Sequence, residues 1–155
     1  MVEKFAADAM LGRLARWLRL LGYDTFYRAH ITDAELLRVA LGEDRLVLTR
    51  DHRLARRRLA RGRCLLLKAQ EPREQLREVL QALGLRPRGR PLCPRCGGPL
   101  RRLPRQRARA LVPEHVYFAQ ERFFRCAGCG HPYWEGTQHR RFSQLVNDII
   151  RKNAP

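Results

Sequence analysis

Four of the five cysteines form two CxxC pairs, a spacing that is typical of a zinc site. The first pair is Cys93 and Cys96, and the second pair is Cys126 and Cys129. Each pair supplies two thiolates from one tight turn, so the two pairs together can complete a tetrahedral site for Zn²⁺. Disulfide bonds are the alternative, but CxxC pairs without a secretory context more often bind metal. The sequence therefore predicts a structural zinc site.

The interval between the two cysteine pairs is longer than usual. It contains 29 residues, whereas roughly 15–20 residues separate the pairs in most such sites. We expect a long β-hairpin to take up the excess. The fifth cysteine, Cys64, lies in an apolar run and is expected in a strand as a small buried hydrophobic residue.

Three aspartates stand where a second metal ion could bind. Asp8 ends the first predicted strand, Asp33 follows the second, and Asp51 ends the third. Ligands of an open α/β sheet bind beyond the carboxyl ends of its strands. Carboxylates gathered there repel one another unless a cation lies among them, and oxygen ligands suit Mg²⁺ or Mn²⁺. Such an ion can bind a phosphate oxygen and activate water.

The same acids also have purely structural explanations. Asp33 and Asp51 precede predicted helices, where an aspartate caps the N-terminus. Capping does not exclude metal binding, because a carboxylate has several lone pairs. Thr49 is expected to orient Asp51 through its hydroxyl. Weaker candidates for a further metal ligand are Glu35 and Glu71.

Strands and helices alternate through the first half of the chain, and these elements must position the acids. The expected strands are residues 2–7, 23–27, 45–49 and 63–67. The expected helices are residues 10–21, 34–41, 52–61 and 72–83. This alternation predicts an α/β fold with a parallel sheet covered on both faces.

The second half of the chain is expected to be a separate module. Residues 86–91 have the composition of a linker, so we predict one domain at residues 1–87 and another at residues 88–155. The second domain would contain the zinc site and a short C-terminal helix at residues 142–150, where apolar residues gather on one side.

Positive charge dominates the chain of 155 residues, whose formal net charge is +17 at pH 7. Residues 1–85 hold 17 Lys or Arg against 11 Asp or Glu, and residues 86–155 hold 15 against 4. Metal-bound thiolates would lower the second balance by about two units without changing its sign. Such a surface attracts polyanions, most commonly nucleic acid. An arginine-rich composition can also reflect genome base composition or a hot habitat.

Membrane and secreted proteins are disfavoured by the sequence. No stretch approaches the roughly 18 apolar residues of a membrane span, and the N-terminus lacks a signal-peptide pattern. The hydrophobic fraction of 45% is that of a globular protein. We therefore expect a cytoplasmic protein with no membrane partner.

Arginines flank the predicted acidic site. Arg13 and Arg16 lie on the helix predicted after the first aspartate, and Arg50 and Arg53 bracket the third. A guanidinium binds phosphate with a planar fork of donors, so these four are candidates for binding RNA. A solvated helix face is the alternative for any one of them. Further arginines on the same predicted helices are Arg19, Arg56, Arg57 and Arg58.

The predicted hairpin and two tryptophans offer further candidate contacts with nucleic acid. Trp17 and Trp134 could stack on bases, although core packing is the simpler explanation for Trp17. The hairpin is expected to contact phosphates without sequence preference. Its arginines are Arg101, Arg102, Arg105, Arg107 and Arg109.

Three blocks of the sequence resemble the Mut-seven C-terminal RNase family, which belongs to the PIN-like nucleases and carries a C-terminal zinc ribbon. The first block is residues 4–24, which read KFAADAMLGRLARWLRLLGYD. The second runs from DAELL at residues 33–37 to LTRD at residues 48–51, and the third is YWEGT at residues 133–137. The resemblance covers nearly the whole chain.

The resemblance implies a PIN-like three-layer fold with a mostly parallel sheet, followed by a small β-rich zinc ribbon and a short C-terminal helix. It also implies metal-dependent cleavage of RNA. By position, Asp8, Asp33 and Asp51 match the family's acidic residues, and Thr49 matches the threonine of its T-x-D turn. A fourth acid, common in PIN nucleases, has no clear match, which leaves open one or two catalytic metals.

Two functions from different classes follow. The first is a metal-dependent ribonuclease with Mg²⁺ or Mn²⁺ at the aspartates, a structural Zn²⁺ at the cysteines and arginines that place the phosphate. The second is a non-catalytic RNA- or ribosome-associated binding module, in which the acids are caps or remnants. A toxin-like ribonuclease is a weaker third. The sequence leaves open the RNA substrate, the oligomeric state and whether the ribbon contacts RNA, the ribosome or another protein.

Overall fold

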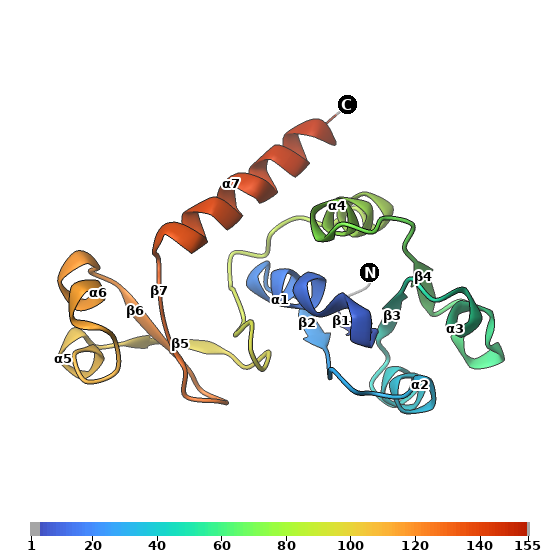
Figure 1. The fold of residues 1–155 in the computed structure, drawn as a ribbon, viewed down its shortest axis with the longest axis horizontal. Helices are drawn as coiled ribbons and strands as arrows, with labels where there is room; N and C mark the ends of the chain where they lie inside the picture. Colours follow the sequence, from blue (N-terminus) through green and yellow to red (C-terminus); the bar gives the residue numbers. More distant parts are fainter. Residues whose placement is uncertain (1–3, 155) are drawn as a thin grey trace. The chain divides into compact units, whose positions relative to one another are not determined.

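The computed structural model describes residues 4–154 and contains two compact units that divide between Gly97 and Gly98 (Figure 1). The boundary predicted after residue 87 concerns independently folding domains and stays a prediction. Each unit has its own sheet. Within the described residues, no helix has both the length and the apolar character to cross a membrane.

A four-stranded parallel sheet forms the centre of the first unit, as the alternation of elements predicts. Its strands are β1 (Lys4–Ala7), β2 (Asp24–Phe26), β3 (Leu46–Thr49) and β4 (Cys64–Leu66), in the order β2-β1-β3-β4. The helices are α1 (Gly12–Leu20), α2 (Asp33–Gly42), α3 (His52–Arg56) and α4 (Pro72–Leu83). Val2 and Glu3, expected in the first strand, lie outside the described residues.

Helices cover both faces of this sheet, which gives three layers (Figure 1). Ala6 and Val47 are fully buried and share one core cluster with Leu36 and Leu37 of α2 and Leu54 of α3. On the opposite side, α1 packs against α4. Alternate strand residues point to opposite faces, so apolar side chains two residues apart serve one layer and their neighbours serve the other.

The third helix is shorter than predicted. It ends at Arg56, and a separate turn of 3₁₀ helix at Arg58–Ala60 follows, because Arg57 has an extended backbone. Leu54 and Ala60 belong to the same buried cluster. In a continuous helix with about 3.6 residues per turn, two residues six apart would lie on different faces. The break therefore lets both side chains reach one core.

The segment after α4 follows the surface of the first unit. The amide of Arg88 donates to the carbonyl of Leu21 at 2.9 Å, and the hydroxyl of Tyr23 donates to the carbonyl of Arg86 at 2.7 Å. Gly22, with φ of 94°, ends α1, and a Cβ there would lie 2.8 Å from the Arg90 carbonyl oxygen. Glycine is therefore required both by the conformation and by the close approach of the chain.

An antiparallel sheet with the order β5-β6-β7 forms the second unit. Its strands are β5 (Leu100–Leu103), β6 (Phe123–Cys126) and β7 (Pro132–Trp134). The hairpin predicted between the cysteine pairs is present as the antiparallel pair of β5 and β6. Its strands are short, and the excess residues form α5 (Arg105–Ala108) and α6 (Glu114–Ala119) in the connection. These helices and the turn between them bring Ala108, Val112 and Val116 into a core with Leu103 and Phe123.

The C-terminal helix α7 runs from Thr137 to Lys152 and is longer than the predicted residues 142–150. The extra residues at its start are polar, so apolar spacing did not reveal them. The parallel sheet, the small antiparallel sheet and the final helix together confirm the predicted α/β class with a small β-rich module.

Candidate functional site

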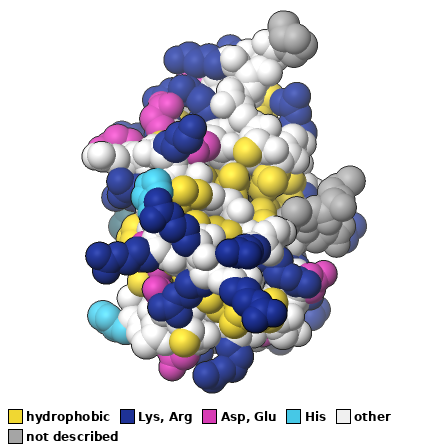
Figure 2. Space-filling model, turned by 90° about the vertical axis from the view of Figure 1, so that its right-hand side faces the viewer, with side chains coloured by type: hydrophobic (Ala, Val, Ile, Leu, Met, Phe, Trp, Pro, Cys, Tyr) yellow, Lys and Arg dark blue, Asp and Glu magenta, His cyan; other side chains and the backbone are white. Residues whose placement is uncertain are grey.

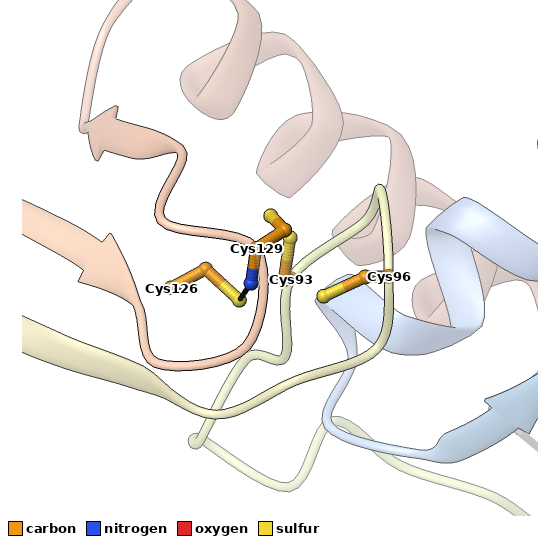
Figure 3. A group of neighbouring side chains, drawn as sticks. All are labelled: Cys93, Cys96, Cys126 and Cys129. Atoms are coloured by element: carbon orange, nitrogen blue, oxygen red, sulfur yellow. Dashed lines mark hydrogen bonds between the residues drawn. The ribbon is translucent and has the colours of Figure 1, made fainter.

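The four cysteines of the two CxxC pairs lie together, as the spacing predicts (Figure 3). The sulfur atoms of Cys93, Cys96, Cys126 and Cys129 are all within 4.8 Å of one another. A Zn–S bond is about 2.3 Å long, so four sulfurs at these separations fit around one tetrahedral ion. Each thiol is free of disulfide bonds. The cluster can hold a zinc ion.

The two cysteine turns have the same local geometry. The amide of Gly97 donates to the carbonyl of Cys93 at 2.7 Å, and the amide of Gly130 donates to the carbonyl of Cys126 at 3.0 Å. Both glycines have positive φ, 82° and 76°, a conformation that a β-carbon disfavours. Hydrogen bonds to sulfur, which stabilise thiolates, reach Sγ of Cys126 from the amides of Gly128 and Cys129, at 3.3 and 3.4 Å.

Arg19 stabilises the first cysteine turn through a hydrogen bond to its backbone. Its side chain is buried, its Nε donates to the carbonyl of Thr25 at 2.9 Å, and its Nη1 donates to the carbonyl of Pro94 at 3.1 Å. Burial lowers the pKa of Arg19, and the neighbouring charges of Cys96 and Cys93 oppose this change. The sequence grouped Arg19 with Arg13 and Arg16 as a candidate surface arginine of α1. That grouping is wrong, because the guanidinium of Arg19 is buried and bonded to backbone carbonyls.

The acidic site begins with a pair of hydrogen bonds at the carboxyl edge of β1 and β3. The hydroxyl of Thr49 donates to Oδ2 of Asp8 at 2.6 Å, and the backbone amide of Asp51 donates to the same hydroxyl at 2.9 Å. Thr49 is fully buried, and Asp8 is 5% exposed. The hydroxyl thus connects the two aspartates, and the acid that it orients is Asp8 rather than Asp51.

Sheet register explains why these residues meet. Ala7 of β1 pairs with Leu48 of the parallel strand β3, and the amide of Asp8 continues this pairing by donating to the Leu48 carbonyl at 2.9 Å. The next residue on each strand is therefore Asp8 on one side and Thr49 on the other. Both strands end here, so the two side chains lie at the sheet edge where ligands of α/β proteins bind.

Two of the aspartates also cap helices. Oδ1 of Asp8 accepts from the amide of Ala9 at 2.8 Å, and Oδ1 of Asp51 accepts from the amides of Arg53 and Leu54 at 2.8 and 3.4 Å. Among the described residues, no hydrogen-bond donor contacts Oδ2 of Asp51. That oxygen remains available to a ligand.

Asp33 is held differently from the other two acids. It is the first residue of α2, and the N-cap is Thr32 rather than Asp33 as predicted. Thr32 and Glu35 form a reciprocal capping box, which also occupies the carboxylate of Glu35. Oδ2 of Asp33 pairs with Nη2 of Arg57 at 3.5 Å. Glu71 is exposed and precedes α4 without a side-chain capping bond.

The three aspartates do not close into one metal-sized cluster. Within residues 4–154, a group of at least three His, Cys, Asp or Glu side chains close enough to share one ion is found at the four cysteines and not at the aspartates. The donor chemistry still fits a hard cation, since Asp51 and Asp33 each have a carboxylate oxygen without a partner among the described residues. Mg²⁺ keeps several waters and needs few carboxylates.

The predicted RNA-binding arginines occupy distinct environments. Arg13, Arg16 and Arg53 are exposed, while Arg50 is half-buried. The buried Nε of Arg50 has no hydrogen-bond partner in the described part of the chain. Lys and Arg side chains spread over the face drawn in Figure 2, where Asp and Glu side chains are fewer. Their role in binding RNA stays a prediction.

Arginines of the second unit stack on its aromatic rings. Arg105 lies 4.3 Å from the ring centroid of Tyr117 and donates to the carbonyls of Tyr117 and Gln120. Arg101, Arg102, Arg107 and Arg109 are exposed. Arg105 therefore holds the α5–α6 insert in place. Arg102 lies over the ring of Phe124 and Arg109 over that of Tyr117, each 5.8 Å from the ring centroid. Trp17 and Trp134 are both half-buried.

Two contacts near the acids were not evident from the sequence. The hydroxyl of Tyr27 donates to the carbonyl of Ala9 at 2.8 Å and lies where a Cβ on Gly12 would come within 2.8 Å. Gly12 thus lets Tyr27 hold the turn that follows Asp8. Arg57 was predicted as one of several surface arginines, and its pairing with Asp33 depends on the unforeseen break after α3.

Comparison with known proteins gives one match. The family model described as Mut7-C RNAse domain matches residues 3–146. No curated protein and no solved structure matches the chain.

Proposed function

The chain belongs to the Mut7-C RNAse domain family, and on that premise we propose that it is a metal-dependent ribonuclease that hydrolyses RNA phosphodiester bonds. The observation that carries the proposal is the bridge from Asp8 through the Thr49 hydroxyl to Asp51. In the order β2-β1-β3-β4, the chain leaves β1 toward one edge and β3 toward the other. Ligands of doubly wound sheets bind at such a switch point.

Asp8, Asp51 and Asp33 are the proposed ligands of the catalytic ion, Mg²⁺ or Mn²⁺. Such an ion, when bound, lowers the pKa of a water molecule and offsets charge on a leaving oxygen. Thr49 fixes the rotamer of Asp8 through its 2.6 Å hydrogen bond, so one ligand is held in place before any substrate arrives. Asp33 would become a ligand by giving up its ion pair with Arg57 and binding the metal ion instead.

Arginines place the RNA backbone in this proposal. Arg50 precedes Asp51 directly and carries a buried Nε–H that lacks an acceptor among the described residues. A phosphate oxygen could accept from that donor once the side chain turned outward, and a charge-assisted hydrogen bond of this kind is roughly twice as strong as a neutral one. Arg13, Arg16 and Arg53, all exposed, extend the positive surface around the acids.

The remaining features agree with a PIN-like nuclease that carries a zinc ribbon. Zn²⁺ at the four cysteines would be structural, because a four-thiolate shell leaves no open position for substrate. The absence of disulfide bonds among the cysteines of residues 4–154 suits a reducing compartment such as the cytoplasm. The ribbon and its exposed arginines would help to hold RNA.

Cleavage of a labelled structured RNA and of a labelled single-stranded RNA tests the proposal. Cleavage by the zinc-loaded protein is measured in the presence of Mg²⁺, in the presence of Mn²⁺ and without an added divalent ion. The Asp8→Asn variant is measured under the same three conditions. We expect cleavage that needs the divalent ion and is lost in Asp8→Asn. Cleavage that persists in Asp8→Asn with an intact fold would overturn the assignment of the site.

A non-catalytic RNA-binding module is the second candidate, and one observation favours it. Asp51 caps α3 and Asp33 pairs with Arg57, so both acids already have structural roles. In that case RNA binds equally well with or without Mg²⁺, neither RNA is cleaved, and Asp8→Asn binds like the wild-type chain.

A further inference from the structure

A cavity in the second unit lies at the junction of β7 and α7. Its volume is about 240 Å³, smaller than the roughly 300 Å³ at which pockets for drug-sized ligands begin. The side chains that give it chemical character are His131, Tyr133, Trp134, Thr137, Gln138 and His139. The volume and these side chains suit one flat, polar-edged group.

Two aromatic rings in the wall of the cavity are held by their neighbours. Trp134 packs against the core of the second unit, and the ring of Tyr133 meets that of His131 edge to face at 4.9 Å. Rings fixed before binding lose little conformational entropy when a ligand stacks on them. Gly136 is part of this arrangement, since a Cβ there would lie 3.1 Å from the Trp134 indole.

Polar groups from the first turn of α7 complete the wall. Thr137 and Gln138 offer a hydroxyl and an amide, which can both donate and accept hydrogen bonds. Nucleobases present donors and acceptors at their edges and π faces above and below. Aromatic stacking combined with hydrogen bonds to base edges is how proteins take up unpaired bases of RNA.

The charge around the cavity suits a phosphate attached to that base. Residues 98–155 contain 11 Lys or Arg against 4 Asp or Glu. The acid nearest in sequence, Glu135, is paired with Arg122 at 3.7 Å. His139 and the arginines that follow it on α7 are exposed. The partial positive charge at the start of a helix adds to this field.

We propose that this cavity binds one unpaired RNA nucleotide, whose base stacks on Tyr133 and whose edge faces Thr137 and Gln138. The inference rests on the proposed function for its choice of nucleic acid and deepens it by naming single-stranded RNA as the form recognised. The cavity would bind the RNA strand without taking part in cleavage.

Binding of a short oligoadenylate that contains 2-aminopurine, a fluorescent base, tests the proposal. The full-length, zinc-loaded Asp8→Asn chain is used, so the RNA stays intact. The second variant adds Tyr133→Leu, which keeps apolar bulk and removes the ring. The matched control adds Phe118→Leu, because Phe118 is an aromatic residue of the same unit, 66% exposed and outside the cavity. Zinc content and circular dichroism report folding in each case.

We expect Tyr133→Leu to weaken binding roughly 5- to 150-fold, the range for loss of one base–aromatic stack. Phe118→Leu should leave binding within about twofold of the parent. Unchanged binding in Tyr133→Leu, or an equally large loss in Phe118→Leu, would overturn the proposal. The same oligomer in a duplex should bind more weakly than the single strand, and equal binding would overturn it as well.

Competition by a mononucleotide distinguishes a pocket for one nucleotide from a longer binding groove. Excess 5′-AMP should displace the oligomer, and failure to displace it at saturation would overturn the one-nucleotide pocket. Binding is read without cleavage, so this test can fail while the cleavage test succeeds, and the reverse. A Tyr133→Leu chain that loses zinc is replaced by Gln138→Ala, whose exposed side chain contributes a hydrogen bond and no packing.

Discussion

The hydroxyl of Thr49 donates a 2.6 Å hydrogen bond to Oδ2 of Asp8. This contact is buried and joins residues that are 41 positions apart in the chain. It brings together the ends of two neighbouring parallel strands. The backbone amide of Asp51 donates a second hydrogen bond, to the hydroxyl oxygen of Thr49. The hydroxyl therefore fixes the rotamer of Asp8 and the backbone of Asp51 at the same time.

Thr49→Val should destabilise the protein by about 2 kcal/mol, because it leaves a buried carboxylate oxygen and the Asp51 amide without partners. Urea unfolding measures the change. Thr25→Val is the matched control, since Thr25 is equally buried but loses only one hydrogen bond, to the Tyr23 carbonyl. Thr25→Val should cost about 1 kcal/mol and leave cleavage intact. Equal losses in the two variants would argue against the bridge.

Arg57→Ala should free Asp33 for the ion and lower the Mg²⁺ concentration that gives half-maximal cleavage. The ion pair is half exposed, with side chains 49% and 34% accessible, so its loss should change the stability by less than about 1 kcal/mol. Arg58→Ala, an exposed neighbour, is the control. A higher Mg²⁺ requirement in Arg57→Ala would mean that Arg57 assists the site instead of competing for Asp33.

Cys64 should report the charge of Asp8. Burial raises the pKa of the Cys64 thiol, and the carboxylate of Asp8 raises it further. The folded thiol therefore stays protonated when an unfolded one ionises, so the unfolding free energy should decline as pH rises past about 8.5. Alkylation by iodoacetamide should be slow in the wild type and faster in Asp8→Asn, as mass spectrometry of the Cys64 peptide can measure. Equal rates would exclude a charged Asp8 near Cys64.

Gly12→Ala should destabilise the protein by roughly 1–3 kcal/mol, the usual cost of an extra methyl group in a packed site. The new Cβ would lie 2.8 Å from the Tyr27 hydroxyl and displace its bond to Ala9. Gly42→Ala is the matched control, since a Cβ there meets no atom within 4 Å. That change should stabilise the last turn of α2 by up to about 1 kcal/mol. Thermal unfolding of both variants distinguishes the effects.

Local signals predicted the elements and the cysteine cluster well. Apolar runs that alternate with helix patterns predicted four parallel strands, and Gly84, with φ of 63°, ends α4 as glycine does in many helices. Two CxxC turns carry their geometry within a few residues, so their spacing sufficed to predict the cluster.

Signals that depend on tertiary packing were harder to read. The break at Arg57 lets Leu54 and Ala60 share a core, and the sequence around it has the composition of one helix. The α5–α6 insert in the connection of the β5–β6 hairpin was not predicted, because its apolar residues pack on Phe123, which is distant in sequence. Arg19 is charged, and its burial depends on the carbonyls of Thr25 and Pro94, which accept hydrogen bonds from its guanidinium and are distant in sequence.

Arg19 also links metal supply to the lifetime of the folded chain. Its guanidinium joins the Pro94 carbonyl, inside the first cysteine turn, to the Thr25 carbonyl in β2. An ion that binds only the folded state adds about 1.4 kcal/mol of stability for every tenfold excess over its dissociation constant. Scarce zinc would therefore raise the unfolded fraction of the unit that carries Asp8 and expose it to proteolysis. Abundance of the protein would then follow the supply of zinc.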